Sequence, residues 1–250
     1  MNKKRLSQNF LTDDNVKKNM LKYINIIKTD ILLEIGSGEG SISKDIYKLS
    51  KMAFLVEIDT DLITHLKKNI TISENVKIYN EDILKFNLKD ITRKYKNIRI
   101  IGNIPYKITS KILNFIDIFS DSIKDAHLII QKEMGEKLLK HTDSSIALIL
   151  NYKFKITKLF DIKPNSFKPS PKVTSSLIKL EPKSNEKYLI NYDILKKIIK
   201  ISFEHKRQKI KKTINNIDKF KKYINIEKRP EDVTLNNFIR LSNFLFITKS

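Results

Sequence analysis

The stretch Ile31-Leu-Leu-Glu-Ile-Gly-Ser-Gly-Glu-Gly40 decides the fold of this chain. Residues 31–35 predict a short buried strand, which Gly36 ends by opening a glycine-rich loop. Ile42, Ile46 and Leu49 then recur at helical spacing. A strand, a glycine loop and a helix in this order are typical of an α/β sheet that receives a nucleotide-like ligand at the loop.

The same alternation continues along the chain. Further short apolar strands are predicted at residues 53–58, 76–79, 98–101 and 128–130, with helical or loop segments between them. Strands that are buried on both faces and separated by helices form a doubly wound, mostly parallel sheet, so we predict a Rossmann-like α/β fold. Residues 146–156 and 175–180 lack a helical spacer, which favours an antiparallel edge there.

The pattern changes after residues 181–186, Glu-Pro-Lys-Ser-Asn-Glu, whose composition is typical of a linker. Beyond this segment the apolar residues recur only at helical spacing. We therefore predict two domains, an α/β domain over residues 1–182 and a small all-helical domain over residues 183–250.

Composition excludes several classes of protein. The chain of 250 residues is 40% hydrophobic, has no cysteine and contains no apolar run near the roughly 18 residues that span a bilayer. A disordered chain, a disulfide scaffold, a thiolate zinc site and an integral membrane protein are thereby disfavoured. The basic start lacks the apolar segment of a secretory signal, so we expect a cytoplasmic location.

The formal net charge is +21, from 49 Lys plus Arg against 28 Asp plus Glu. Such a field attracts polyanions, and Lys suits phosphates better than base edges, which favours RNA-backbone recognition. Compositional drift is the alternative, because only six basic residues are Arg. One dense cluster is predicted to open a helix and to contact RNA, rather than to be only a solvated face: Lys206, Arg207, Lys209, Lys211 and Lys212. The four histidines show no metal-ligand spacing, so no metal site is predicted.

Four residues follow four of the predicted strands: Gly36, Glu57, Asp82 and Asn103. The carboxyl ends of parallel strands share one edge, where ligands of such sheets bind. An acid about twenty residues after the glycine loop suits ribose hydroxyls, and an acid after the next strand suits an adenine amino group. The spacing G-x-G-x-G favours an adenosyl group over a pyrophosphate. Each residue alone could be an ordinary loop residue, but the set predicts one site.

The segment Asn103-Ile-Pro-Tyr106 carries the chemistry. Methylation of an exocyclic amine such as adenine N6 is difficult, because the lone pair of the nitrogen is delocalised into the ring. Two hydrogen-bond acceptors at its N–H groups favour the more tetrahedral nitrogen of the methyl-transfer transition state. The Asn103 side-chain oxygen and the Ile104 carbonyl supply these acceptors. Pro105 stiffens the turn, and Tyr106 stacks on the base.

These motifs resemble those of the ribosomal RNA adenine N6,N6-dimethyltransferases of the KsgA type. The resemblance runs over nearly the whole chain, and it rests on seven motifs, at residues 7–11, 34–40, 56–59, 103–106, 131–133, 167–173 and 229–231. It implies an enzyme that methylates two adjacent adenosines near the 3′ end of small-subunit rRNA, twice each, during ribosome assembly. For the oligomeric state a monomer is the simpler expectation.

The resemblance also implies roles for residues. S-adenosylmethionine is expected at Asn9, Leu11, Gly36, Glu57, Asp82 and Asn103, with Gln8 and Asn9 near its methionine end. Phe167 is expected to face Tyr106 across the target base, which is drawn out of its hairpin loop.

The chain departs from the family pattern after Glu133, where the loop through residue 143 is short and lacks a glycine-containing aromatic stretch. Lys137 stands where the family tends to carry Arg. Two rival functions remain open: an Erm-type enzyme that methylates one large-subunit adenosine, and a non-catalytic RNA-binding assembly or transcription factor of the same fold. The motifs at residues 167–173 and 229–231 favour the small-subunit enzyme.

Overall fold

The structure, a computed structural model, describes residues 8–71, 73–140, 144–183, 190–214, 217–221 and 224–247. The chain divides into two compact units, Met1–Gly135 with Lys155–Pro182, and Glu136–Phe154 with Lys183–Ser250. Residues 136–154 therefore group with the C-terminal unit, whereas the sequence placed them in the first domain. No helix of the described residues is long and apolar enough to cross a membrane.

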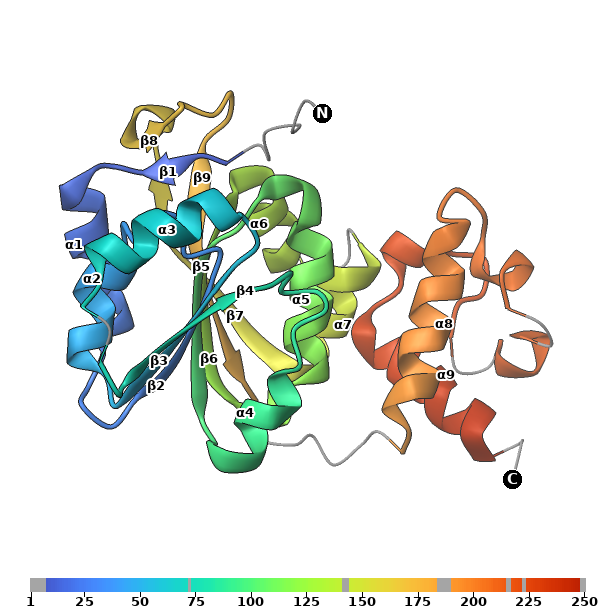
Figure 1. Cartoon of the computed structure of the whole chain (residues 1–250). Coiled ribbons are helices and arrows are strands. Elements are labelled where there is room, and N and C mark those ends of the chain that lie inside the picture. Colours follow the sequence, from blue (N-terminus) through green and yellow to red (C-terminus); the bar gives the residue numbers. More distant parts are fainter. Residues whose placement is uncertain are drawn as a thin grey trace, which may run out of the picture. The chain divides into compact units, whose positions relative to one another are not determined.

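A seven-stranded sheet forms the centre of the first unit, in the order β4-β3-β2-β5-β6-β9-β7 (Figure 1). Its strands are β2 (Ile31–Ile35), β3 (Met52–Glu57), β4 (Val76–Asn80), β5 (Ile98–Asn103), β6 (Ile123–Gln131), β7 (Phe154–Ile162) and β9 (Ser175–Pro182). The pairs from β4 to β6 are parallel, and β9 runs antiparallel to β6. The predicted fold class and its antiparallel edge are confirmed.

One strand prediction was wrong. Residues 146–153, part of the segment 146–156 that was predicted as a strand, belong to helix α7 (Ser145–Lys153), and β7 begins only at Phe154. Residues 146–151 of this helix are all buried, so the helical period is hidden by apolar residues on every face.

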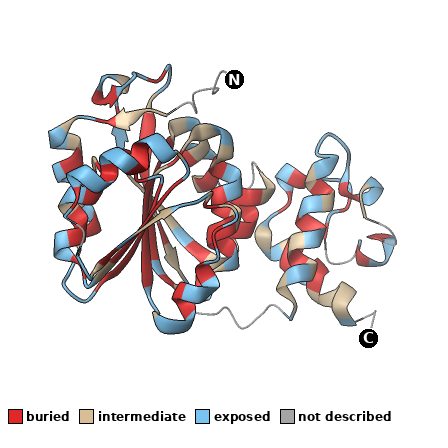
Figure 2. Ribbon diagram, viewed as in Figure 1, coloured by how far each residue is buried: buried red, intermediate tan, exposed pale blue. Residues whose placement is uncertain are grey.

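Helices cover both faces of the sheet. On one face lie α1 (Asp14–Ile24), α2 (Ser43–Ile46) and α3 (Thr60–Asn69), and on the other lie α4 (Leu88–Lys94) and α5 (Thr109–Ile118) (Figure 1). Helix α1 begins after the N-cap Asp13, whose carboxylate accepts the backbone N–H of Asn15 and of Val16. The strands β2, β3 and β5 between these layers are buried almost throughout, as Figure 2 shows.

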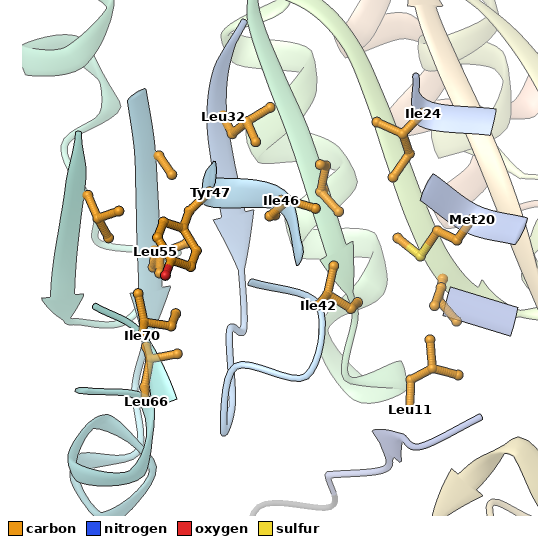
Figure 3. Packing of buried hydrophobic residues seen from close by; sticks show 14 of the residues in the cluster. Leu11, Met20, Ile24, Leu32, Ile42, Ile46, Tyr47, Leu55, Leu66 and Ile70 are labelled. Atoms are coloured by element: carbon orange, nitrogen blue, oxygen red, sulfur yellow. The ribbon is translucent and has the colours of Figure 1, made fainter. Parts of the chain in front are cut away.

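The core under α1, α2 and α3 combines residues from most elements of this unit (Figure 3). Leu32 and Leu55 point from neighbouring strands toward Ile46 and Tyr47, and Met20 and Ile24 close the same layer from α1. The close packing of this layer holds the strands in place, so that their carboxyl ends emerge from the core at a defined position.

A small antiparallel sheet joins the N-terminal segment to a distant part of the chain. It pairs β1 (Phe10–Leu11) with β8 (Phe167–Lys168), with Leu11 opposite Phe167. The N-terminal segment is thereby held close to the carboxyl edge of the large sheet.

The second unit is helical and has its own core. It contains α7, α8 (Tyr192–Glu204) and α9 (Leu235–Ile247), while α6 (Lys132–Leu139) spans the boundary between the units. Just before α9, the Thr234 hydroxyl accepts the backbone N–H of Asn237. Residues 184–186 of the predicted linker lie outside the described residues.

The basic cluster of this unit is placed differently from the prediction. It does not open an α-helix: α8 ends at Glu204, and the cluster continues through a turn into a 3-10 helix, Ile210–Lys212. All five basic side chains are exposed, and the buried Ile210 anchors the segment in the core. Lys209 and Lys211 both form ion pairs with Glu227, at 2.8 and 2.6 Å.

Candidate active site

A cavity of about 610 Å³ lies at the carboxyl edge of the large sheet. Strands β2 and β5 are adjacent there, with Ile35 opposite Gly102, and the chain leaves them toward opposite ends of the sheet. Such a switch point is where open α/β sheets bind ligands. Gly36 and Asn103 are consequently neighbours, and a Cβ added to Gly36 would lie 3.8 Å from the Asn103 carbonyl oxygen.

Most of the predicted site residues line this cavity: Gln8, Asn9, Gly36, Glu57, Asp82, Asn103, Ile104, Pro105 and Tyr106. The lining also includes Phe10, Gly38 and Gln131, which belong to predicted motifs but had no assigned role, and residues that the sequence reasoning did not single out, among them Glu81, Lys107 and Lys111. Each of these lies within a few residues of a predicted motif, so proximity along the chain was the available signal.

Two predicted residues lie elsewhere. Leu11 and Phe167 are 2% and 4% exposed, and both belong to the core cluster under α1, α2 and α3. Neither is among the described residues that line the cavity. In this structure Phe167 therefore does not offer a ring face to a base beside Tyr106, and its contribution is to hold β8 against β1.

The glycine loop requires glycine at position 38. Gly38 has a φ of +56°, and a Cβ there would meet the Phe10 ring at 3.0 Å. Its backbone N–H donates to one carboxylate oxygen of Glu57 at 2.9 Å, and the N–H of Asp59 donates to the other at 2.9 Å. Glu57 thus ties the loop to the end of β3 while keeping further lone pairs for a ligand.

A second carboxyl group lies beneath the loop. Glu34 in β2 is 2% exposed, and Ser43 at the start of α2 donates a hydrogen bond to its side chain. Burial raises the pKa of the Glu34 carboxyl to about 8, the hydrogen bond from Ser43 opposes this rise, and the neighbouring carboxylate of Glu57 adds to it. Glu34 is therefore mainly a neutral acid at pH 7.

The orientation of the Asn103 side chain is fixed by the N-terminal segment. Its amide nitrogen donates to the backbone carbonyl of Asn9 at 2.6 Å. Because a carbonyl oxygen can only accept a hydrogen bond, the amide nitrogen of Asn103 has to face Asn9, and Oδ1 has to point away from the Asn9 carbonyl. The backbone N–H of Ile104 donates to the Ile129 carbonyl at 3.0 Å, which anchors the start of the turn on β6.

Tyr106 is half-buried, and its hydroxyl forms a hydrogen bond with the buried hydroxyl of Ser175 at 2.7 Å. This contact anchors the far end of the side chain on β9, so the ring is held in one place at the cavity.

The donor set fits S-adenosylmethionine. A cavity of this volume suits a ligand of that size, the loop lets the ligand approach the backbone, and the carboxylates of Glu57, Glu81 and Asp82 suit hydroxyl groups and a cationic sulfonium. Fold and site together define an S-adenosylmethionine-dependent methyltransferase of the Rossmann-like class.

Comparison with known proteins identifies the family. The chain belongs to the ribosomal RNA adenine dimethylase family, which it matches over residues 1–246. It is 34% identical to the ribosomal RNA small subunit methyltransferase A of Francisella tularensis subsp. novicida, over 97% of each chain. It is accordingly an S-adenosylmethionine-dependent rRNA adenine methyltransferase.

Solved structures agree in fold. A dimethyladenosine transferase from Plasmodium falciparum is 27% identical, with a TM-score of 0.76 over 96% of this chain and 98% of that one. The 23S rRNA methyltransferase ErmE has a TM-score of 0.73 over 95% of this chain and 100% of that one, at 20% identity. At that identity the likeness to ErmE concerns the fold alone.

Proposed function

We propose that this enzyme methylates N6 of two adjacent adenosines in a hairpin near the 3′ end of small-subunit rRNA, giving N6,N6-dimethyladenosine during subunit assembly. The small-subunit target is supported by the name of the Francisella relatives, which match 97% of the chain. The Erm-type alternative has only a likeness of fold in its favour. The intact cavity speaks against a non-catalytic factor.

The observation that carries the proposed mechanism is the hydrogen bond from Asn103 to the Asn9 carbonyl. It leaves Oδ1 of Asn103 to accept one N–H of the target N6, and the Ile104 carbonyl accepts the other. Pro105 restricts the turn between these acceptors and Tyr106.

With both acceptors in place, the N6 lone pair is drawn out of conjugation with the purine ring and becomes more nucleophilic. S-adenosylmethionine supplies an electrophilic methyl group on a sulfonium. Tyr106, held by Ser175, stacks on the base and fixes N6 at the acceptors. The two oxygens then stabilise the cationic nitrogen until its proton leaves to solvent, so no strong general base is required.

For the cofactor, Glu57 accepts the ribose hydroxyls, Asp82 accepts the adenine amino group, and Gln8 and Asn9 lie toward the methionine end. All four line the cavity. Leu11 supports this site from the core, since it places the segment that carries Asn9.

We assign the helical unit to rRNA docking, through the exposed cluster Lys206, Arg207, Lys209, Lys211 and Lys212. Glu227 neutralises part of the charge of Lys209 and Lys211, and their hydrogen bonds lower the pKa of Glu227 to about 2. Lys206, Arg207 and Lys212 therefore carry most of the available charge. A monomeric state and a cytoplasmic location remain predictions.

The test is methylation of purified rRNA substrates followed by mass spectrometry of their nucleosides. Small-subunit particles, large-subunit rRNA and buffer alone are compared, with Asn103→Ala as the inactive control. Dimethyladenosine only in the small-subunit sample is expected. Methylation of the large-subunit rRNA alone would replace the proposal by the Erm-type function, and no methylation of either would revive the non-catalytic reading.

A further inference from the structure

The charged side chains of the cavity fall into two groups. Glu57, Glu81 and Asp82 lie at the ends of β3 and β4 and form an acidic side. Lys107 and Lys111 line the cavity from the segment that follows β5. The site therefore offers acceptors for hydroxyl and cationic groups on one side and ammonium groups for an anion on the other.

The two lysines share one helical face. Lys107 lies in the 3-10 turn Tyr106–Ile108, which continues directly into α5, and Lys111 is four residues further on. At that spacing the side chains are neighbours. Both are exposed, and neither forms a hydrogen bond or ion pair through its side chain with any residue that the structure describes.

The proximity of these two charges is unfavourable when no ligand is bound. Two like charges four residues apart on a helix repel each other. An anion bound between or beside the two ammonium groups would offset this repulsion.

The position of Lys107 indicates which anion. Lys107 directly follows Tyr106, the residue proposed to stack on the target base. A nucleotide that is drawn into a pocket brings its own backbone phosphates to the pocket mouth. The carboxylate of S-adenosylmethionine is the other candidate anion, but the methionine end is assigned to Gln8 and Asn9.

We propose that Lys107 and Lys111 bind RNA backbone phosphates that flank the flipped adenosine, and so hold the target strand at the mouth of the cavity. This inference rests on the proposed function. It gives the first unit an RNA contact of its own, independent of the basic cluster of the helical unit.

The experiment compares Lys107→Gln/Lys111→Gln with the matched control Lys18→Gln/Lys22→Gln. The control removes two exposed charges at the same spacing from α1, away from the cavity lining. Three quantities are measured for each: the KM for the RNA over a range of salt concentrations, kcat, and the Kd of S-adenosylmethionine by calorimetry. A second RNA substrate carries neutral methylphosphonate linkages on both sides of the target adenosine.

Loss of two phosphate contacts lowers the slope of log affinity against log salt by about 1.5. We expect this decrease, and a KM for the RNA raised by about tenfold at moderate salt, only in the cavity variant, with the Kd of S-adenosylmethionine unchanged. On the methylphosphonate RNA the cavity variant and the wild type should have equal KM values, because the phosphate charge is already absent.

Two results would overturn the inference. A KM and salt slope equal to those of the control would mean that the lysines contact no phosphate. A weakened affinity for S-adenosylmethionine with an unchanged KM for the RNA would assign them to the cofactor carboxylate instead. Failure of the proposed function looks different, because then the wild type itself transfers no methyl group to adenosine.

Discussion

The amide nitrogen of Asn103 donates a hydrogen bond to the backbone carbonyl of Asn9 at 2.6 Å, across 94 positions of the sequence. The last residue of β5 is thereby linked to the segment that enters β1. This bond turns a side chain that could rotate freely into a fixed acceptor, and it makes the N-terminal segment part of the catalytic geometry.

Replacement of Asn103 by Ala should lower kcat by roughly two to three orders of magnitude, because one acceptor for the transition-state N–H is lost. The affinity for S-adenosylmethionine should change much less. Single-turnover methyl transfer and calorimetry measure the two quantities separately. Near-normal turnover in this variant would remove Asn103 from the mechanism.

Asn103→Asp makes a finer test of the same bond. An ionised Asp has no proton to donate to the Asn9 carbonyl, so two oxygens would oppose each other at hydrogen-bond distance. Only the protonated acid restores the contact. We expect kcat of this variant to rise as the pH falls from 8 to 6, relative to wild type measured on the same RNA, and an identical pH profile would contradict the anchoring role.

Glu57→Ala should weaken S-adenosylmethionine binding by about 1–3 kcal/mol, through the loss of ribose hydrogen bonds and of the acceptor for the Gly38 N–H. Glu81→Ala is the matched comparison, since Glu81 lines the same cavity but is exposed. Calorimetric titration distinguishes them. Equal losses in both variants would point to a general effect of negative charge instead of a ribose contact.

Glu34 should make folding stability depend on pH. Its pKa is about 8 in the folded chain, against an ordinary value of 4.5 for an exposed glutamate, so the folded state holds the proton over this range. The stabilisation is complete below about pH 4.5 and is lost as the pH rises to about 8. Glu34→Gln should remove this dependence, whereas the exposed Glu74→Gln should retain it. Urea unfolding between pH 5 and 9 provides the measurement, and equal pH slopes for wild type and Glu34→Gln would refute the neutral acid.

Arg99 is predicted to matter for stability and not for catalysis. Its guanidinium donates to both carboxylate oxygens of Asp125, to the Asp30 carboxylate and to the backbone carbonyl of Ile24. Arg99 is the second residue of β5, whereas Asn103 is the last. Arg99→Met leaves Asp125 buried without this partner and should lower the free energy of unfolding by about 3–5 kcal/mol. Below the unfolding transition kcat should match wild type, and a stability loss under 1 kcal/mol would contradict the account.

Charge reversal at Lys206, Arg207 and Lys212 should lower the salt slope of RNA binding by at least 2, at about 0.7–0.9 per contact. The matched control reverses three other exposed lysines of the same unit, Lys197, Lys200 and Lys219. Filter binding across salt concentrations gives the slope, and calorimetry checks that cofactor affinity is unchanged. Equal slopes for the two variants would mean that total charge, and not this cluster, drives docking.

The sequence determined the elements whose signals are local. Residues 31–35 are a strand because they form a short apolar run that ends at Gly36, and the acids and the asparagine at the strand ends converge because parallel strands share one carboxyl edge. The resemblance to the family could be read from the same residues, because several of its motifs lie at these strand ends. Local patterns gave the wrong element in two places. Helix α7 has apolar residues on every face and was predicted as a strand, and the basic segment at residues 210–212 forms a 3-10 turn where an α-helix was predicted.

Tertiary structure alone decided which distant segments meet. Nothing near Asn9 predicts that its carbonyl orients Asn103, and nothing near Phe167 predicts that it pairs with Leu11 in the core instead of lining the cavity. The grouping of residues 136–154 with the helical unit is of the same kind. Such contacts depend on how the packed layers bring together segments that are far apart in the sequence. A local pattern of residue types carries no information about that packing.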